Sequence, residues 1–556
     1  MGDKIVNLSS MKNDRRQFIK TAGLVGAGVG FLGFGGIRAL GGVGGIGETG
    51  EIGKRDGFGG EQDWGNGGTR FPRVSPESQG VSSQAIRKFV AAAGASGISW
   101  HSFMLLRHGQ VVAEGWWKPY EPSFVHSLYS LSKSFTSTAI GLLVKEGKLD
   151  IHAKVVSFFP NDLPVTVSDN LQQMTVRSLL TMNTGHAEDT MPKMRASSSS
   201  WVRTYLAQPV EFAPGTHFLY NTGNTYMLGA IVHHITGETL ESYLGPRLFQ
   251  PLGITGYDWE VSPQGLNTAG YGLRVKTEDI ASLGQLYLSK GSWKGSSILP
   301  SAWVEEATSA QTTSQVNNGD WSEGYGYQFW RCTHGCYRGD GAYGQFCIVM
   351  PEQDAVLAVT SQSPDMQKSL NIIWDNLLPG IQAGALPENA GEHGELMKEL
   401  TVLGLPVVRG SVKSPGASKY NKKKWILADN EFGVGSLELS FSGKGCVLSS
   451  MAGGKSTKME FGWENWVLNS SREDYVFRTG QMVPMPSRIA GTATWINDHT
   501  LQLNVRFVEA IFGDNITFVF DGDSLSVSFL NSVDETAVKK NPDPRKPISG
   551  KAQSRS

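Results

Sequence analysis

The spacing of apolar residues changes once along this chain of 556 residues, near Lys422. Beyond that point apolar and polar residues alternate, as in 501–507, which is the period of a strand with one buried face. Before it, helical and strand-like spacings are mixed. The change predicts two folded parts: an α/β (α+β) part over 71–380, and a separate antiparallel β sandwich or barrel over 422–532.

Three further segments flank or connect these parts. Residues 42–70 are rich in glycine and predict a flexible linker. Residues 381–421 are rich in glycine, proline and charge, and predict a second linker. Residues 533–556 are rich in lysine, proline and serine, so we expect a disordered tail.

Residues 1–41 have the layout of an export signal. Arg15 and Arg16 precede an uncharged, glycine-rich segment over 21–37. A basic region before a short apolar stretch is typical of signal peptides, and the paired arginines resemble a twin-arginine signal. We therefore expect the twin-arginine export machinery to carry the protein to the periplasm, where an uncleaved leader would tether it to the membrane.

Composition excludes several classes of protein. Lys and Arg number 50 against 51 Asp and Glu, so the chain lacks the positive charge on which nucleic-acid binders depend. A mean hydropathy of -0.21 is too polar for a protein with many membrane spans. Four cysteines cannot form a disulfide framework, and neither His-Glu-x-x-His nor Cys-x-x-Cys occurs, so no metal site is indicated.

The sequence Ser130-Leu-Ser-Lys133 opens an apolar segment, 134–144, that predicts a buried helix. Residues three apart share a helix face, so the Lys133 amine can approach the Ser130 hydroxyl. A serine hydroxyl needs a base to become a nucleophile, and burial favours the neutral amine that can serve as one. The pattern alone is weak, because Ser9 and Lys12 repeat it in the leader and a helix N-cap with a solvated lysine explains it equally well.

Two further segments give this pattern a context. Residues 214–223 are Pro-Gly-Thr-His-Phe-Leu-Tyr-Asn-Thr-Gly, and 338–352 run from Arg-Gly-Asp-Gly-Ala to Met-Pro-Glu. With 130–133, these segments make residues 72–380 resemble the serine β-lactamase and penicillin-binding superfamily. Within it the chain looks most like class C β-lactamases, related esterases and 6-aminohexanoate-dimer hydrolases. The resemblance implies an antiparallel sheet flanked by helices, with an all-helical subdomain.

The resemblance also implies roles for individual residues. Ser130 corresponds to the acylated nucleophile, and Lys133 and Tyr220 to the pair that transfers protons. The backbone N–H groups of Ser130 and Ala342 correspond to the oxyanion hole. No metal or organic cofactor is implied.

Two motifs depart from the family pattern. Thr222 stands where an asparagine is usual, so Asn221 is the expected substitute in substrate binding. The third motif, usually Lys-Thr-Gly, is Gly339-Asp340-Gly341, whose glycines we expect to let a substrate approach closely. In members that recognise β-lactams the missing lysine helps to hold a carboxylate. We therefore expect weak or absent β-lactamase activity, with Asp340 favouring an amine or a neutral group.

Other features are weaker or stay open. Ser168-Asp-Asn170 matches a class A β-lactamase motif but lies in a predicted surface loop before a helix, and Gly-x-Ser-x-Gly does not occur. Cys332 and Cys336 can close a disulfide across a hairpin tip or remain free thiols.

The preferred interpretation is an exported serine hydrolase that cleaves an amide or ester of a small molecule or short peptide through an acyl-enzyme. One alternative is a non-catalytic receptor of the same fold for peptidoglycan or peptides. A second alternative is a true class C-type β-lactamase or D-Ala peptidase. The oligomeric state, the substrate and the role of the C-terminal part stay open at this point.

Overall fold

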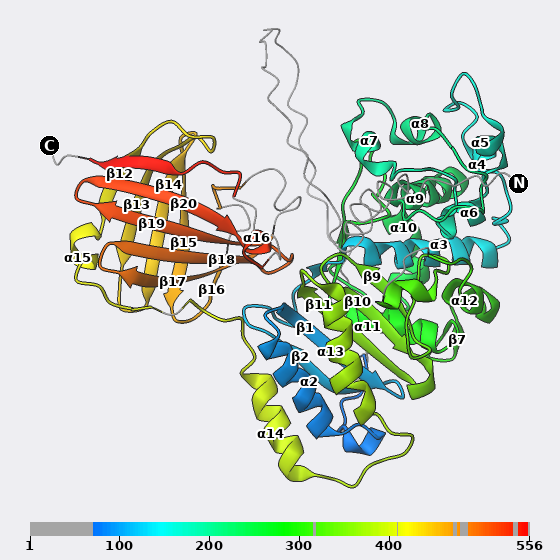
Figure 1. Cartoon of the computed structure of the whole chain (residues 1–556), viewed down its shortest axis with the longest axis horizontal. Helices are drawn as coiled ribbons and strands as arrows, with labels where there is room; N and C mark the ends of the chain where they lie inside the picture. Colours follow the sequence, from blue (N-terminus) through cyan, green and yellow to red (C-terminus); the bar gives the residue numbers. More distant parts are fainter. Residues whose placement is uncertain are drawn as a thin grey trace, which may run out of the picture. The chain divides into compact units, whose positions relative to one another are not determined.

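The computed structural model describes residues 70–314, 319–408, 410–470, 475–478, 487–536 and 543–553. The expected leader, 1–41, and almost all of the first expected linker lie outside the described residues. The described chain contains an α/β part and a β-barrel part with separate hydrophobic cores (Figure 1). No helix among these residues combines the length and apolar character needed to cross a membrane.

The α/β part is built on a six-stranded antiparallel sheet. Its order is β2 (Gln110–Trp116), β1 (Ser99–Arg107), β11 (Ala355–Gln362), β10 (Gln345–Met350), β9 (Tyr337–Gly341) and β8 (Trp330–Arg331). The register places Phe103 of β1 opposite Val359 of β11, so the two ends of this part meet at the centre of the sheet. All of β10 and β11 is buried, which explains their continuous apolar runs and requires a layer on each face.

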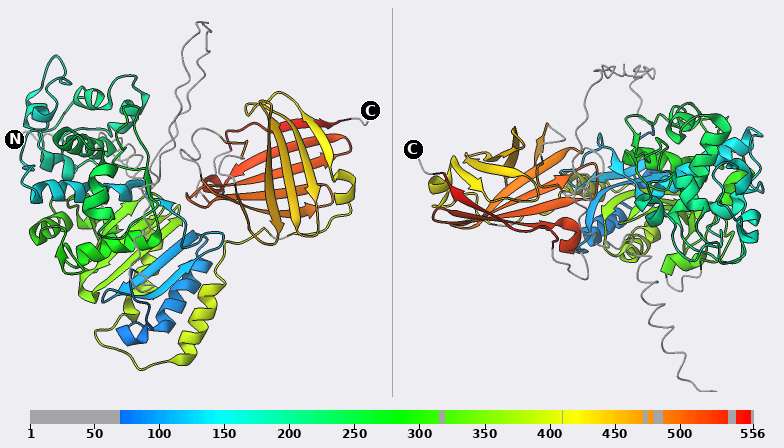
Figure 2. Two further views of the ribbon diagram at one scale, coloured as in Figure 1. Left: turned by 180° about the vertical axis from the view of Figure 1, so that it is seen from behind. Right: turned by 90° about the horizontal axis from the view of Figure 1, so that it is seen from above.

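Helices supply both layers (Figures 1 and 2). On one face Phe89 of α2 (Ser83–Ala95) packs edge-on against Phe103, with ring centroids 5.3 Å apart. On the other face α11 (Thr277–Leu288) approaches so closely that a Cβ added at Gly284 would lie 2.5 Å from Val356. Val356 and Val359 are three positions apart in β11, so their side chains point to opposite faces of the sheet. Helices α2 and α11 therefore cover opposite faces.

The expected linker over 381–421 is wrong for its first half. Residues Ala390–Thr401 form helix α14, which packs against α2. Arg87 of α2 binds Glu392 and Glu399 of α14, each at 2.7 Å. Helix α13 (Met366–Asn376) also packs on α2, so α2, α13 and α14 form one helical layer on this face of the sheet. The α/β part therefore extends to α14 and does not end near residue 380.

The helical subdomain surrounds α3 (Ser132–Lys145), which is buried from Ser132 to Leu143 and packs against α9 (Thr222–Thr236). Ser168 caps α5 (Asp169–Gln173) and accepts a hydrogen bond from Leu171 N at 3.2 Å, which agrees with its predicted place before a helix. The other short elements of this part are α4 (Val155–Phe158), α6 (Val176–Leu180), α7 (Met191–Ala196), α8 (Trp201–Leu206), α10 (Leu240–Leu244), α12 (Ser301–Thr308), β3 (His126–Ser127), β4 (Asp258–Trp259), β5 (Leu273–Val275), β6 (Ser292–Trp293) and β7 (Ser296–Ser297).

The C-terminal part is a closed barrel of nine strands. In barrel order they are β12 (Lys423–Leu427), β13 (Val434–Phe441), β14 (Gly445–Ala452), β15 (Lys455–Trp463), β17 (Ile489–Asn497), β18 (Thr500–Phe507), β19 (Gly513–Asp521), β20 (Ser524–Asn531) and β21 (Ile548–Ala552). A parallel pairing of Gly462 with Thr492 joins β15 to β17, and β16 (Val467–Asn469) also pairs with β17. The apolar residues of 501–507 are all fully buried, which confirms the predicted alternation.

The expected disordered tail, 533–556, is wrong where it forms β21. This strand pairs with β12 on one side and β20 on the other, and so completes the barrel. Its sequence, Ile-Ser-Gly-Lys-Ala, has one large apolar residue, the buried Ile548, and therefore shows little alternation. The short helix α16 (Ser532–Thr536) follows β20.

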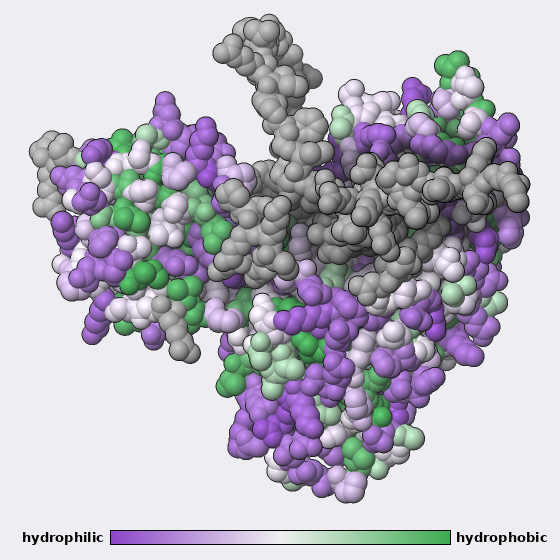
Figure 3. All heavy atoms as spheres, viewed as in Figure 1, coloured by the Kyte–Doolittle hydropathy of each residue, from purple (hydrophilic) through white to green (hydrophobic). Residues whose placement is uncertain are grey.

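Apolar side chains on the face of the molecule drawn in Figure 3 are scattered in small groups among hydrophilic ones. The most exposed of the large apolar residues, Val165 and Val402, lie in different parts of the chain. Isolated apolar residues are ordinary on protein surfaces and indicate no particular partner.

Candidate active site

Ser130 lies on a single 3-10 turn, Tyr129–Leu131, directly before α3. Tyr129 has a φ of 50°, in the left-handed region that costs a tyrosine conformational energy. Ser132 holds the turn in place, because its hydroxyl donates to Tyr129 O at 2.7 Å and accepts from Leu273 N at 3.2 Å. The strained residue therefore immediately precedes the expected nucleophile.

Lys133 lies in the first turn of α3 and is only 1% exposed. Its Nζ lies 3.0 Å from Ser130 Oγ and donates to Gly270 O at 2.8 Å and Thr222 Oγ1 at 3.4 Å. Burial lowers the pKa of Lys133 to about 7, although nearby carboxylates oppose the shift. A large fraction of the amine is therefore neutral near pH 7 and able to accept a proton from Ser130.

Tyr220 lies immediately before the N-cap of α9. Its ring stacks on Trp330 with centroids 5.5 Å apart, and Lys133 Nζ lies 5.0 Å from its ring centroid. The Ser130 side chain is close enough to the Tyr220 hydroxyl to oppose part of the rise in the pKa of this phenol. Burial raises the pKa of the Tyr220 phenol well above its usual value, so this group stays protonated and acts as a donor. Ser130 and Lys133, predicted from one segment, thus converge with Tyr220, predicted from another.

The structure gives Asn221 a different role from the expected substrate contact. Its side-chain oxygen accepts hydrogen bonds from Gly223 N at 2.9 Å, Thr190 N at 3.1 Å and Thr190 Oγ1 at 2.8 Å. Asn221 is fully buried as the N-cap of α9, where it satisfies a free backbone N–H. Thr222, the residue at the usual asparagine position, is the one that reaches Lys133.

Strand β9 packs directly on the nucleophile turn. A Cβ at Gly341 would lie 2.1 Å from Leu128 O, and one at Gly339 would lie 2.3 Å from Leu131 Cδ1. These glycines are therefore needed for close packing of the chain against itself, and not for the approach of a substrate as expected. Ala342 follows β9 in the turn to β10, half-buried, and its carbonyl accepts from Gln345 Nε2 at 3.1 Å.

Asp340 is not the free carboxylate that the sequence suggested. Its Oδ2 accepts a hydrogen bond from Arg338 Nε at 2.9 Å, and the two side chains are almost completely buried. Residues two apart in a strand share a face, so the pairing follows from the strand itself. The negative charge of Asp340 is balanced by Arg338, and the expected preference for an amine loses its basis.

Cys332 and Cys336 are free, buried thiols, so the disulfide alternative is not realised in this structure. Their backbones face each other at the end of the β8–β9 hairpin, with Cys332 N donating to Cys336 O at 2.9 Å. The Cys332 thiol instead accepts a hydrogen bond from Arg338 Nη1 at 3.0 Å.

Asp189 is part of this region, and sequence reasoning missed it. Its Oδ1 accepts hydrogen bonds from Thr222 N at 3.0 Å and Met191 N at 3.1 Å. Burial raises the pKa of its carboxyl, and the charge of Lys133 opposes this. Asp189 lies in no motif of the sequence, so only the folded chain brings it near Lys133.

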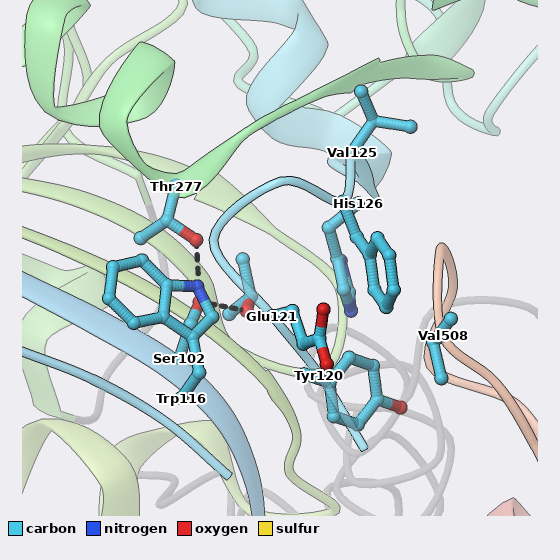
Figure 4. Close-up of a pocket in the computed structure, with 10 residues that line it drawn as sticks. Ser102, Trp116, Tyr120, Glu121, Val125, His126, Thr277 and Val508 are labelled. Carbon is cyan, nitrogen blue, oxygen red and sulfur yellow. Dashed lines mark hydrogen bonds between the residues drawn. The ribbon is translucent and has the colours of Figure 1, made fainter. Parts of the chain in front are cut away.

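A separate hollow of about 10 Å³ lies beside β3 (Figure 4). Ser102 and His126 are among the residues that line it, and Ser102 Oγ bonds Thr277 Oγ1 at 2.7 Å. This volume suits one water molecule. Since none of the three converging residues lines it, the hollow is not the candidate active site. Within the part of the chain that the structure describes, no group of three or more His, Cys, Asp or Glu side chains could hold a metal ion.

The antiparallel sheet, the buried α3 and the Ser-x-x-Lys turn before it together define a β-lactamase-like fold. The sequence profile of the β-lactamase family matches residues 83–378, just over half of the chain. The chain belongs to the β-lactamase family, which confirms the predicted family and fold class. The matched range ends in the layer of helices α13 and α2, and the barrel lies outside it.

Known relatives include hydrolases of two kinds. The chain is 27% identical over 305 residues to 6-aminohexanoate-dimer hydrolase of Paenarthrobacter ureafaciens, covering 50% of this chain and 76% of that protein. It is 24% identical over 231 residues to a β-lactamase of Escherichia coli K12, covering 38% and 57% respectively. A solved putative 6-aminohexanoate-dimer hydrolase from Bacillus anthracis matches with a TM-score of 0.43 and 20% identity, covering 60% of this chain and 86% of that one.

Proposed function

We propose that the protein is a serine hydrolase that cleaves an amide or ester bond through an acyl-enzyme on Ser130. The observation that carries the proposal is the 3.0 Å contact between Ser130 Oγ and the buried amine of Lys133. A lysine whose pKa lies near 7 is a base matched to neutral pH.

In the acylation step Lys133 accepts the Ser130 proton while Oγ attacks the substrate carbonyl carbon. The backbone N–H groups of Ser130 and Ala342 stabilise the oxyanion that forms. Tyr220 then donates its proton to the departing nitrogen or oxygen, and Lys133 returns a proton to Tyr220. The amine or alcohol leaves, and the acyl group remains on Ser130.

Water completes the reaction by the reverse route. It attacks the acyl carbon, gives a proton to the Lys133 and Tyr220 pair, and releases the carboxylic acid. Ser130 regains its proton from Lys133, so protons and bonds balance over the cycle.

The non-catalytic receptor is the less favoured function. A buried lysine and a buried phenol that converge on one hydroxyl destabilise a fold, because each loses hydration. A receptor would gain nothing from that arrangement, whereas a hydrolase needs it. The third motif lacks the usual lysine, and this argues against an efficient β-lactamase or D-Ala peptidase.

The location of the activity is a proposal of its own. The leader with Arg15 and Arg16 favours export by the twin-arginine machinery to the periplasm, with a tether where the leader stays uncleaved. A fusion of residues 1–69 to a reporter that is active only after export should lose its signal when both arginines become lysine. Undiminished signal in that variant would contradict this route.

A fluorophosphonate probe tests the proposed chemistry, because it reacts with activated serine hydroxyls. We expect one adduct, located on Ser130 by peptide mass spectrometry and absent in Ser130→Ala. Ser157→Ala is the matched control and should keep the adduct, since that hydroxyl is exposed on another helix, α4, and donates to Lys154 O at 2.7 Å. A folded wild-type protein without any adduct would favour the receptor.

A further inference from the structure

Two tyrosines beside the candidate active site, Tyr129 and Tyr343, pack edge-on against each other, with ring centroids 5.7 Å apart. Both backbones lie in the left-handed region, with a φ of 50° at Tyr129 and 65° at Tyr343. In the part of the chain that the structure describes, no other tyrosine, phenylalanine or tryptophan has a positive φ. Such strain persists at a bulky residue only where the surrounding contacts hold it.

Tyr129 directly precedes Ser130 in the nucleophile turn. Its carbonyl oxygen accepts a hydrogen bond from Ser132 Oγ at 2.7 Å. The C=O and N–H of a trans peptide point in opposite directions, so this bond directs the Ser130 N–H away from Ser132. The backbone of Tyr129 therefore helps to set the direction of one N–H group proposed for the oxyanion hole.

Tyr343 lies in the turn that joins β9 to β10. Gly344 N donates to Gly341 O at 3.1 Å, which closes a β-turn with Tyr343 at its second central position. A positive φ at that position ordinarily calls for glycine. The Gly341 carbonyl faces into the turn, so the Ala342 N–H of the same peptide points out of it. Tyr343 thus belongs to the turn that carries the second N–H group proposed for the oxyanion hole.

We propose that the ring contact between Tyr129 and Tyr343 couples these two turns and so positions the oxyanion hole. Glycine at either position would relieve the backbone strain, but it would remove the aromatic contact that joins the turns. The tyrosines are positioning residues, because they act through the Ser130 and Ala342 amides. This inference rests on the proposed acyl-enzyme chemistry and adds to it the pair that holds its two N–H donors in place.

The rings, and not the phenol hydroxyls, should matter for hydrolysis of 4-nitrophenyl hexanoate. Tyr343→Phe keeps the ring and should match the wild type. Tyr343→Leu lacks the ring at the same φ, so we expect kcat/KM to fall about thirtyfold, mostly through kcat. The matched control is Phe158→Ala, which removes a half-buried ring packed edge-on against His234 and should change kcat/KM by less than about twofold.

A transition-state analogue separates positioning from a loss of folded protein. Pentylboronic acid forms a bond from boron to an activated serine oxygen, and its tetrahedral anion resembles the acylation intermediate. Its Ki should rise in Tyr343→Leu by about the same factor as kcat/KM falls. Partial unfolding only lowers the active fraction, so a lower kcat with an unchanged Ki would overturn the inference.

A double-mutant cycle tests the contact itself. Tyr129→Leu should cause a loss similar to that of Tyr343→Leu. The double variant should lose no more than about threefold beyond either single variant, because the contact is already broken. Losses that multiply would mean that the rings act separately and would refute the coupling.

The remaining outcomes distinguish this inference from the proposed function. An unchanged kcat/KM and boronate Ki in Tyr343→Leu overturn the inference and leave the hydrolase intact. A wild-type protein that neither hydrolyses the ester nor takes the fluorophosphonate label overturns the proposed function instead. If the thermal transition shows that Tyr343→Leu does not fold, Tyr343→Gly removes the ring without backbone strain, and an unchanged kcat/KM there still refutes the inference.

Discussion

Lys133→Met should lower kcat on 4-nitrophenyl hexanoate by roughly a thousandfold, because it removes the base that accepts the Ser130 proton. Methionine has a similar length and suits a buried position, so the fold should persist. The measurement is steady-state hydrolysis with circular dichroism to confirm folding. The matched control is Lys145→Met on the same helix, whose amine binds backbone carbonyls away from Ser130 and whose kcat should change by less than about threefold.

The wild-type pH profile gives a second, independent measure of the same base. Burial lowers the pKa of Lys133 to about 7, and only the neutral amine accepts a proton. The kcat/KM should therefore be low below pH 6, rise through an inflection near 7 and level off above pH 8. This inflection should be absent from the residual activity of Lys133→Met. An inflection that persists in the variant would assign it to another group.

The convergence of Ser130, Lys133 and Tyr220 could be predicted because each lies in a short motif that can be recognised in the sequence. Ser130 and Lys133 are one helical turn apart, and the apolar segment after them predicted a buried helix correctly. Tyr220 was identified through the family resemblance of the segment 214–223, and the structure places it immediately before the N-cap of α9. These inferences needed no knowledge of distant contacts.

The errors arise where distant contacts decide. Asn221 binds Thr190, 31 residues before it, and so turns into the helix cap. Arg338 and Asp340 lie two residues apart in β9, so their side chains share a face and form an ion pair. The sequence of the motif alone does not show this pairing. Helix α14 and strand β21 have compositions typical of linkers and tails, and only their partners, α2, β12 and β20, give them a stable place.

Strand β21 leads to the second large expected effect, which concerns stability. A chain that ends at Pro547 lacks this strand, so β12 and β20 lose their shared neighbour and expose two unpaired edges. The loss of buried Ile548 alone is expected to cost about 2–5 kcal/mol, before the lost backbone hydrogen bonds are counted. Since the total stability of a domain is only about 5–15 kcal/mol, the barrel should become largely unfolded.

Two measurements check this expectation. Trp425 and Trp495 are buried in the barrel core, so its opening should shift tryptophan emission to longer wavelength. Limited proteolysis should cut the truncated chain within 423–531 while the intact chain resists. The matched control ends at Gln553, which keeps all of β21 and should match the full-length protein in both assays. Equal protease resistance of the two truncated chains would mean that eight strands suffice and that β21 only covers a barrel already closed by β15 and β17.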